Sequence, residues 1–540
     1  MNSPAIRPSD LASAHKLIMD QNCQLHEQDR QLHEQGKNID AQKKCIIDLK
    51  AQNAYLQEQL RLANLRRFAR SSERFVDHND PQGLLFDEDE LPIPEEKDVE
   101  IQDIPAHQRK KRRGKRESLP EFLERIRVEH TLPESELIGP DGEQYTKIGE
   151  VTSEELQVIP MQMRVIVHAR YQYAVKEREE LGVKIAPMPK KAIPKSIASS
   201  SLLAHIVQAK FCHHLPLYRQ EQIWQALDVS TPRNSMCRWI QKLGDLTEPL
   251  IAVMLKKMKQ HGHIHVDETT VTLLKDKNKK EGNPSHLGYM WVYKNRHGTV
   301  FDYRACRSGK NPESILGDYK GYIQTDRYGG YNILFKEGSG RVSAGCMAHA
   351  RRKFMEIAKL SKNKSTGISH YVISRMKVLY DIERLAKDKA MPSDELLKLR
   401  QSQAIPILDD LKKYLIDKEP TIPPRSGLHT AVCYFLRHFD ALKRYTESPL
   451  VNIDNNPAER AIKPFAVGRK NWLFCGNEKG AIASANLYSL IESAKTYNLK
   501  IFDYLQYLFE RLPNLKDEND LLNLLPVNAQ HYLPKVKRID

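Results

Sequence analysis

Three acidic residues, far apart in the chain, have the types and surroundings needed for metal chemistry. Asp267 lies in the β-branched run HIHVDETTVTLL, and Asp326 ends the run YIQTD just before two glycines. Glu459 is the one acid of the stretch NNPAERAIKPFAVGRKNW. The cations of that stretch are Arg460, Lys463, Arg469 and Lys470. Carboxylates held together repel, and a divalent cation relieves the repulsion. Hard oxygen ligands suit Mg²⁺ or Mn²⁺ and phosphate substrates, and metal-bound phosphate also needs cations to hold its backbone.

The order of predicted elements explains how two of these acids could meet. Three strand-like runs (HIHVDETTVTLL, GYMWVYKN and TVFDYRAC) precede a helical stretch, the strand YIQTD, the strand RVSAGCMAH and the helix ARRKFMEIAKL. This is the order of a ribonuclease-H-like domain, a mixed sheet covered by helices. An acid on its first strand and an acid ending its fourth approach each other at one edge of the sheet. Asp267 and Asp326 occupy those places. Glu459 would follow on a later helix that has Pro457 in its first turn.

Each acid also has a purely structural explanation. Glu459 fits a capping box with Asn456 and an ion pair with the lysine four residues later. Asp326 before a glycine turn fits an Asx turn. Strand alternation puts either Asp267 or its neighbour Glu268 on the wrong face, and the motif discussed below favours Asp267.

Other residues are candidates for contacts with DNA phosphates. The four cations around Glu459 would bind phosphate on one side of the site. Contacts on the other rim are expected from His349, Arg351 and Arg352. Trp472 either stacks on a flipped base or belongs to the core. The histidines have no metal-ligand spacing, so core or phosphate roles are expected for them; they are His213, His214, His265 and His349.

The charge balance and a helical hairpin both favour a nucleic acid partner. The net charge of +15 over 540 residues favours a polyanion, with nucleic acid before a membrane surface. The run QRKKRRGKR could be a phosphate-binding arm. RQEQIWQALDVSTPRNSMCRWIQ predicts a helix-turn-helix with Ala226 in its first helix. Its second helix would carry Arg233 and Arg238 into the major groove. A helical hairpin without a DNA role is the alternative.

The N-terminal region predicts a coiled coil. One seam of the heptad pattern runs without a slip, and its members are Leu11, Ile18, Leu25, Leu32, Ile39, Ile46, Asn53 and Leu60. Such a pattern favours self-association. A long amphipathic helix that packs on its own protein is the alternative.

The sequence therefore predicts a multidomain α/β protein. The expected parts are a coiled coil (1–75), an acidic linker (76–107), a basic arm with a small β-rich module (108–190), a helix-turn-helix-like domain (191–254), the first part of the catalytic domain (255–362), a mostly helical insertion (363–448), its second part (449–512) and a C-terminal tail (513–540). The eight scattered cysteines form no C-x-x-C pair and predict no disulfide framework. Without an apolar run of about 18 residues or a signal peptide, we expect a cytoplasmic protein, associated with the nucleoid when it binds DNA.

The motifs together resemble a known family. HVDETTVTLL, YIQTDRYGGYN, GCMAHARRKF and IDNNPAERAIKPFAVGRKNWLFCGNEKGAIASANLYSLIESAK are similar to the bacterial insertion-sequence transposases of the IS66 family, of DDE type. The resemblance implies that Asp267, Asp326 and Glu459 bind two Mg²⁺ or Mn²⁺ ions about 3.5 to 4 Å apart. It further implies cleavage at the element's ends, strand transfer into target DNA, a homo-oligomer holding two ends, and small accessory proteins of the same element as plausible partners.

One departure from the family concerns zinc. Relatives usually carry a cysteine-rich zinc-binding module near LIGPDGE and YAVKERE, and both cysteine pairs are absent here. Zinc is therefore not expected in this degenerate module. The alternatives to an active transposase are a catalytically silent DNA-binding regulator descended from one and a nuclease of the same fold.

Overall fold

The computed structural model describes residues 161–173, 183–274, 286–359, 367–515 and 517–536, with single residues and short stretches between 19 and 60 and between 124 and 156. The chain divides into two compact units, one formed by Met1–Pro94 with Lys190–Asp540 and the other by Glu95–Pro189. The expected acidic linker and the basic run at 108–116 lie outside the described residues.

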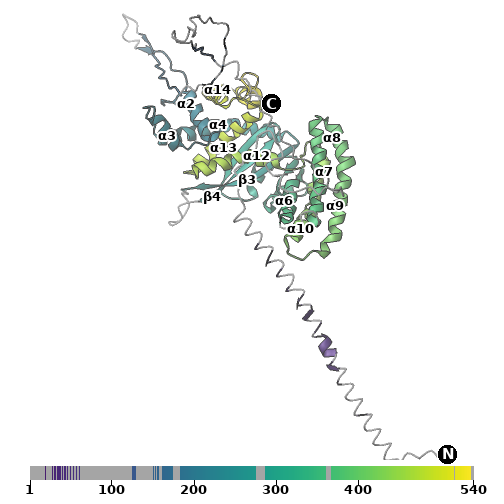
Figure 1. Cartoon of the computed structure of the whole chain (residues 1–540). Coiled ribbons are helices and arrows are strands. Elements are labelled where there is room, and N and C mark those ends of the chain that lie inside the picture. Colours follow the sequence, from purple (N-terminus) through teal and green to yellow (C-terminus); the bar gives the residue numbers. More distant parts are fainter. Residues whose placement is uncertain are drawn as a thin grey trace, which may run out of the picture. The chain divides into compact units, whose positions relative to one another are not determined.

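A mixed five-stranded sheet forms the centre of the first unit (Figure 1). Its order is β5-β4-β3-β6-β7. β3 pairs antiparallel with β4 and parallel with β6, β4 pairs antiparallel with β5, and β6 pairs parallel with β7. The strands are β3 (His263–Leu273), β4 (His286–Asn295), β5 (Gly298–Arg304), β6 (Gly321–Gln324) and β7 (Arg341–Ala344). Parallel neighbours need crossover connections. The connection from the border strand β5 to β6 crosses the sheet and contains helix α5 (Lys310–Leu316). The short 3₁₀ segment η4 (Gly329–Phe335) lies in the crossover between the parallel neighbours β6 and β7. The predicted mixed sheet is confirmed.

Helix α13 (Glu478–Thr496) covers the outer edge of this sheet at β5. Ser493 Oγ accepts a hydrogen bond from Thr299 N–H and donates one to the Thr299 carbonyl, both at 2.9 Å. Ser489 Oγ accepts one from Phe301 N–H at 2.7 Å. An edge strand has unpaired backbone groups on its outer side. Two serines four residues apart, on one face of a helix, satisfy three of those groups: the N–H and carbonyl of Thr299 and the N–H of Phe301.

The helical segment before the sheet belongs to the same core. It consists of α2 (Ser200–Phe211), α3 (Leu217–Gln225) and α4 (Arg233–Lys259). Their buried side chains form one hydrophobic cluster with those of the sheet and of α13. The expected domain boundary at residue 254 falls inside α4. This helix belongs to the same core as the sheet, because its apolar face packs along α13. A close helix contact fixes that packing: Asn486 Nδ2 donates to the Gly244 carbonyl at 3.0 Å.

The C-terminal segment is also folded. Helix α14 (Ile501–Arg511) packs on α2, α15 (Glu518–Leu524) packs on α4, and α16 (Pro526–Ala529) packs on α13. Leu524 and Leu525 are buried in the same core. The expected C-terminal tail is therefore largely a structural part of this unit.

The insertion after α6 (Met347–Ala358) is helical and has a core of its own, which it shares with α6. Its helices are α7 (Ile368–Asp388), α8 (Ser393–Leu399), α9 (Ile405–Lys418), α10 (Gly427–Arg437) and α11 (Phe439–Lys443). Arg400 is 2% exposed and pairs with Glu383 at 2.7 Å. Its NH1 donates to the carbonyls of Tyr445, Ser448 and Val451 at 2.7 to 3.0 Å. The insertion thus holds the segment that leads back to the sheet.

The second unit contains little regular structure among its described residues. Strands β1 (Gln172–Tyr173) and β2 (Lys184–Ile185) pair antiparallel over two residues each. The strand predicted from the run RVIVHARYQYAV is wrong for residues 164–171, which have no strand structure. Val165 and Val167 are 90% and 84% exposed, so these β-branched side chains have no surface to pack against.

The described residues between Met19 and Leu60 are helical. The apolar side chains of the heptad pattern are exposed there, and they are Ile39, Ile46, Leu49, Leu56 and Leu60. Gln57 Nε2 donates to the polar seam member Asn53 at 3.0 Å. The coiled coil remains a prediction. Among the described residues, no helix combines the length and apolarity that crossing a membrane requires.

The packing of α4 on α13 gives a first testable prediction. A Cβ added at Gly244 would lie 2.4 Å from Ala483 Cβ and 2.5 Å from Ala483 Cα. We expect Gly244→Ala to reduce the free energy of unfolding by about 1 to 3 kcal/mol, because neither helix can yield without moving backbone. Thermal unfolding followed by tryptophan fluorescence measures the effect. Gly476→Ala is the control, since a Cβ there meets nothing within 4 Å. Equal midpoints for the two variants would contradict the close packing.

Candidate functional site

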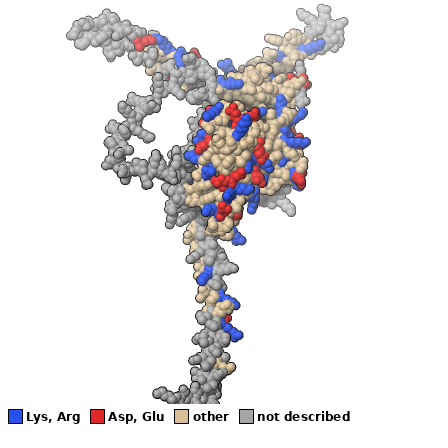
Figure 2. All heavy atoms as spheres, turned by 90° about the vertical axis from the view of Figure 1, so that its right-hand side faces the viewer, with Lys and Arg blue, Asp and Glu red and all other residues tan. Residues whose placement is uncertain are grey.

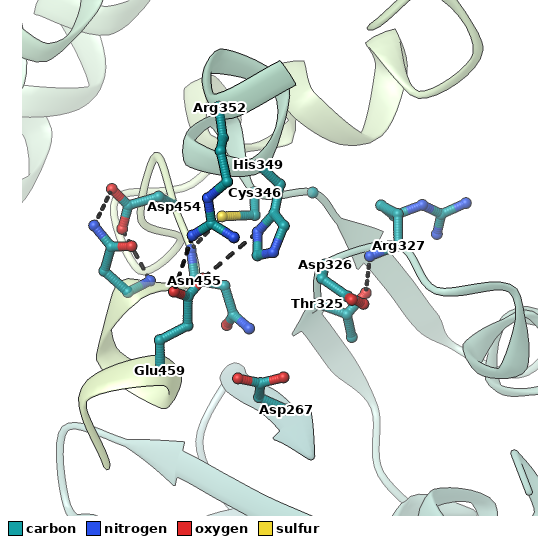
Figure 3. A network of polar contacts seen from close by, with 12 residues as sticks. Asp267, Thr325, Asp326, Arg327, Cys346, His349, Arg352, Asp454, Asn455 and Glu459 are labelled. Carbon is teal, nitrogen blue, oxygen red and sulfur yellow. Dashed lines mark hydrogen bonds and ion pairs between the residues drawn. The ribbon is translucent and has the colours of Figure 1, made fainter. Parts of the chain in front are cut away.

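The three predicted acids come together from three separate elements (Figure 3). Asp267 lies within β3, Asp326 lies two residues after the end of the neighbouring strand β6, and Glu459 lies in the first turn of α12 (Asn456–Trp472). Helix α12 packs on β3 and β4. The parallel pairing of β3 with β6 brings the two aspartates to one edge, and α12 brings the glutamate to the same place.

Asp267 is the most strongly perturbed of the three. Burial is the main cause that raises the pKa of its carboxyl well above the usual range, and the nearby carboxylates of Glu268, Glu459 and Asp326 add to the effect. Its Oδ1 accepts one hydrogen bond, from Glu268 N–H at 2.9 Å. A buried carboxyl surrounded by like charges is stabilised in its ionised form when a cation joins it.

Asp326 forms the Asx turn that the sequence allowed, and its side chain also lies near the other two acids (Figure 3). Its Oδ1 accepts a hydrogen bond from Tyr328 N–H at 2.8 Å, as in an Asx turn, and Arg327 between them has a φ of 67°. The hydroxyl of Tyr434, from the insertion, donates to the Asp326 carbonyl at 3.0 Å. The turn fixes the backbone of Asp326 while its side chain lies beside the other acids (Figure 3).

Glu459 does not make the structural contacts that its sequence allowed. Asn455, rather than Asn456, precedes the first helical residue, and no side chain caps the helix. The described ion pair of Glu459 is with Arg352 NH2 at 3.7 Å, not with Lys463, and its Oε1 lies 3.5 Å from His349 Nδ1. Burial raises the pKa of Glu459, against the opposing effect of Arg352. Burial and Arg352 also lower the pKa of His349 to about 4, so this imidazole is neutral near pH 7 and compensates the carboxylate poorly.

These observations show that a divalent cation fits the site. Glu459 Oε1 and His349 Nδ1 are buried and have no hydrogen-bond partner. Asp267 lies among other acids, and the ion pairs of the described residues include neither Asp267 nor Asp326. Three carboxylates are the hard oxygen donors that Mg²⁺ and Mn²⁺ prefer.

Glu268 belongs to a different set of contacts from Asp267. Its side chain is 2% exposed, pairs with Arg307 at 2.6 Å and accepts a hydrogen bond from the Tyr331 hydroxyl. Its charge is therefore compensated within the protein. The preference for Asp267 over Glu268 as a metal ligand is consistent with this difference.

The cations predicted around Glu459 have different surroundings. Arg460, Lys463 and Lys470 are exposed along α12. Arg469 NH1 instead donates to Thr270 Oγ1 at 2.8 Å and to the Thr270 carbonyl, and so ties α12 to β3. Trp472 is 9% exposed and packs edge-on against Phe465, as the core alternative required.

The remaining predicted contacts lie on α6 and α4. Arg352 is 45% exposed beside Glu459, whereas Arg351 is buried over the ring of Tyr380. Arg233 and Arg238 are exposed in the first turns of α4, away from its buried apolar face. His265 is a buried core residue that contacts Asn455 and Asn452, and neither His213 nor His214 is among the described contacts of the three acids.

Two residues just before α12 were missed by the sequence reasoning. Asn455 is fully buried, its Nδ2 donates to the Val266 carbonyl at 3.0 Å, and its backbone N–H donates to Cys346 Sγ at 3.2 Å. Asp454 accepts hydrogen bonds from the backbone and the side chain of Asn456 at 3.1 and 2.9 Å. Burial raises its pKa to about 6, although hydrogen bonds from Asn456 and Tyr380 act in the opposite direction. The polar run DNN before an N-terminal proline was the available signal.

The chain matches models of one protein family along most of its length. A model described as the transposase IS66 family matches residues 195–483, and one described as the IS66 C-terminal element matches residues 489–527. Residues 55–128 match a model described as transposase C of IS166 homeodomain. Residues 140–174 match the zinc-finger binding domain of transposase IS66, yet this stretch contains no cysteine.

Three curated proteins of Sinorhizobium fredii are similar to the chain. The uncharacterized protein y4jD is 29% identical over 90% of this chain and 95% of its own length. The uncharacterized protein y4qI is 29% identical over 71% of each chain, and the uncharacterized protein y4hP is 26% identical over 77% of each.

Asp454 gives a prediction about stability and pH. Its folded-state pKa of about 6 lies above the 3.8 of an ordinary aspartate, so its stabilising contribution is full below about pH 4 and is lost as the pH rises through about 6. The loss amounts to about 3 kcal/mol. Asp454→Asn keeps a neutral side chain at every pH, and the buried, unpaired Asn456 Oδ1 can turn toward the new amide.

We therefore expect wild type to lose up to about 3 kcal/mol of stability relative to Asp454→Asn between about pH 4 and pH 7.5. Denaturant unfolding at several pH values measures this difference. Asp440→Asn, at an exposed position of α11, controls for the loss of one negative charge. A difference between wild type and Asp454→Asn that is the same at every pH would contradict the titration of Asp454.

Proposed function

Because the chain belongs to the IS66 family of transposases, we propose that it is a DDE transposase with a ribonuclease-H-like catalytic domain, which binds the ends of an insertion sequence and catalyses metal-dependent DNA cleavage and strand transfer. One observation carries the proposal: Asp267, Asp326 and Glu459 meet at one edge of a mixed sheet, in a site where their charges are poorly compensated. A strand order of this kind is the one that such a catalytic domain requires.

In this proposal Asp267, Asp326 and Glu459 hold the divalent ions, Mg²⁺ or Mn²⁺. When bound, such ions activate the attacking hydroxyl and stabilise the charge that develops on the phosphate. The protein's part is to hold the carboxylates. The parallel pair β3 and β6 fixes the two aspartates, and the start of α12 fixes Glu459. The positive end of the α12 dipole also favours the ionised form of Glu459 and a nearby phosphate.

DNA contacts are proposed on two surfaces of the first unit. Arg460, Lys463 and Lys470 would bind phosphates along α12, with Arg352 at the opposite rim. Arg233 and Arg238 in the first turns of α4 would enter the major groove, with α3 and α4 as a helix-turn-helix. Figure 2 views the molecule from the side of the insertion and shows Lys and Arg intermixed with Asp and Glu on that face. This mixture does not favour that face as the principal DNA surface.

Assembly and zinc content are further parts of the proposal. The exposed seam that includes Ile39, Ile46 and Leu60 would pair with other copies in a coiled coil, which would hold two ends together. Residues 140–174 contain no thiolate ligand, so we propose that this module does not bind zinc as its relatives do.

Glu459→Gln tests the proposed reaction. The substrate is a labelled DNA fragment bearing the element's own end, supplied with Mg²⁺ or Mn²⁺. We expect cleavage and joining to fall by more than about 100-fold, since even residues behind the metal ligands cost 10- to 100-fold when changed. DNA binding should be retained, because the substitution removes no cation.

Glu478→Gln is the matched control, an exposed glutamate in the first turn of α13. If wild type bound the end but never cut it, the silent regulator would become the better explanation. Cleavage without joining on paired ends would identify a nuclease.

Lys470→Ala tests the α12 surface. Removing one phosphate contact should weaken DNA binding and reduce the slope of log K against log salt by about 1. Lys387→Ala removes an exposed lysine from the insertion and should leave the slope unchanged. Affinity measured at several salt concentrations gives both slopes. An unchanged slope for Lys470→Ala would remove this residue from the interface.

A further inference from the structure

A thiol and an imidazole lie against the glutamate of the acid site. Cys346 Sγ, a ring nitrogen of His349 and a Glu459 carboxylate oxygen all lie within 4.8 Å of one another. Figure 3 shows the Cys346 sulfur, the His349 ring and the Glu459 carboxylate near one another, with the Arg352 guanidinium beside them. We propose that these three residues form a Zn²⁺ site that shares Glu459 with the acid site. Zn²⁺ bound there occupies the Glu459 carboxylate, keeps it from the Mg²⁺ or Mn²⁺ of the acid site and so inhibits the metal-dependent reaction. The inhibition rests on the proposed function, but the metal site does not.

The spacing of the donor atoms suits Zn²⁺. Tetrahedral Zn²⁺ binds nitrogen and oxygen at about 2.0 to 2.2 Å and sulfur at about 2.3 Å, so its donor atoms lie roughly 3.3 to 3.7 Å apart. His349 Nδ1 and Glu459 Oε1 are already 3.5 Å apart. The upper limit of 4.8 Å for the other pairs requires side-chain movements of about an ångström. A fourth position remains for water or substrate, as at zinc sites with three protein ligands.

The donor types distinguish this site from that of the three acids. Mg²⁺ and Mn²⁺ prefer oxygen, whereas sulfur with imidazole selects Zn²⁺. Both His349 Nδ1 and Glu459 Oε1 are buried without a hydrogen-bond partner, and neither serves another described contact that would keep it from a metal. An ion between them would satisfy both atoms.

The local structure holds the two new ligands together. Cys346 immediately precedes α6, and His349 lies three residues later in its first turn, on the same face of the helix. Cys346 Sγ accepts a hydrogen bond from Asn455 N–H, which stabilises a thiolate. Burial holds the pKa of the free thiol high, so Zn²⁺ must displace its proton to solvent as the Zn–S bond forms.

A second cluster in the insertion provides an internal control. Cys433 Sγ lies 3.6 Å from Glu419 Oε1 and 3.6 to 3.7 Å from the ring nitrogens of His429. It has the same donor types but does not include an acid of the proposed triad. A change at Cys433 therefore separates binding near α6 from binding in the insertion.

The experiment titrates the full, untagged and reduced chain with Co²⁺ as a spectroscopic substitute for Zn²⁺. Ligation by a thiolate gives a sulfur-to-cobalt charge-transfer absorption, which needs no enzymatic activity. We expect this absorption in wild type and in Cys433→Ser, and its loss when Cys346→Ser or His349→Gln is added to Cys433→Ser. Circular dichroism verifies that each variant is folded, and His349→Gln keeps the test decisive if Cys346→Ser does not fold.

The functional arm adds Zn²⁺ to DNA cleavage at fixed Mg²⁺. Each variant is normalised to its own rate without Zn²⁺, and half-inhibition should require at least 10-fold more Zn²⁺ in Cys346→Ser than in Cys433→Ser, on the order of the change expected for losing a ligand. No thiolate absorption in Cys433→Ser, or absorption in that variant that survives the addition of Cys346→Ser in a folded protein, would overturn the site. If the absorption behaves as expected but no DNA is cut, the site holds and the proposed function fails.

Discussion

The arrangement of the three acids depends on the buried amide of Asn455. Its Oδ1 lies 2.9 Å from His265 Nδ1, and its Nδ2 donates to the carbonyl of Val266, the residue before Asp267. Its backbone carbonyl accepts from Glu459 N–H at 3.3 Å. One residue therefore joins the strand of one acid to the helix of another, and its N–H bond to Cys346 extends the connection to α6. Leaving the buried groups of β3 without this partner would cost about 1 to 3 kcal/mol for each group.

The insertion supports the same arrangement from the other side. Arg400 donates hydrogen bonds to carbonyls of the loop that leads to α12. The Tyr434 hydroxyl donates a hydrogen bond to the carbonyl of Asp326. A buried cation is retained where its charge and all its hydrogen bonds are satisfied, as they are here by Glu383 and three carbonyls. The helical insertion is thus part of the scaffold of the acid site, although it separates the strands of the sheet from α12 in sequence.

Much of the sheet and the placement of the acids could be predicted from the sequence. Strand periodicity and turn residues predicted the strands in their order along the chain. The proline after Asn456 predicted the start of the helix that carries Glu459. The strand prediction for residues 164–171 was wrong because β-branched residues favour a strand only where another surface covers their side chains. Contacts between side chains that are far apart in the chain could not be predicted from the sequence. Arg469 resembles a phosphate ligand by type, but its threonine partners on β3 are 199 and 200 residues away.

The serines of α13 have a consequence for how copies of this protein can associate. Thr299 and Phe301 lie on β5, the border strand of the sheet, at the side where a neighbouring chain could add a strand if α13 did not cover it. With those backbone groups already bonded to a helix, strand addition is blocked at this border. A strand from another copy therefore cannot extend the sheet on this side, and no continuous intermolecular sheet forms there. A contact with another copy at this border would therefore use helices and loops, and it could form and separate without disturbing the sheet.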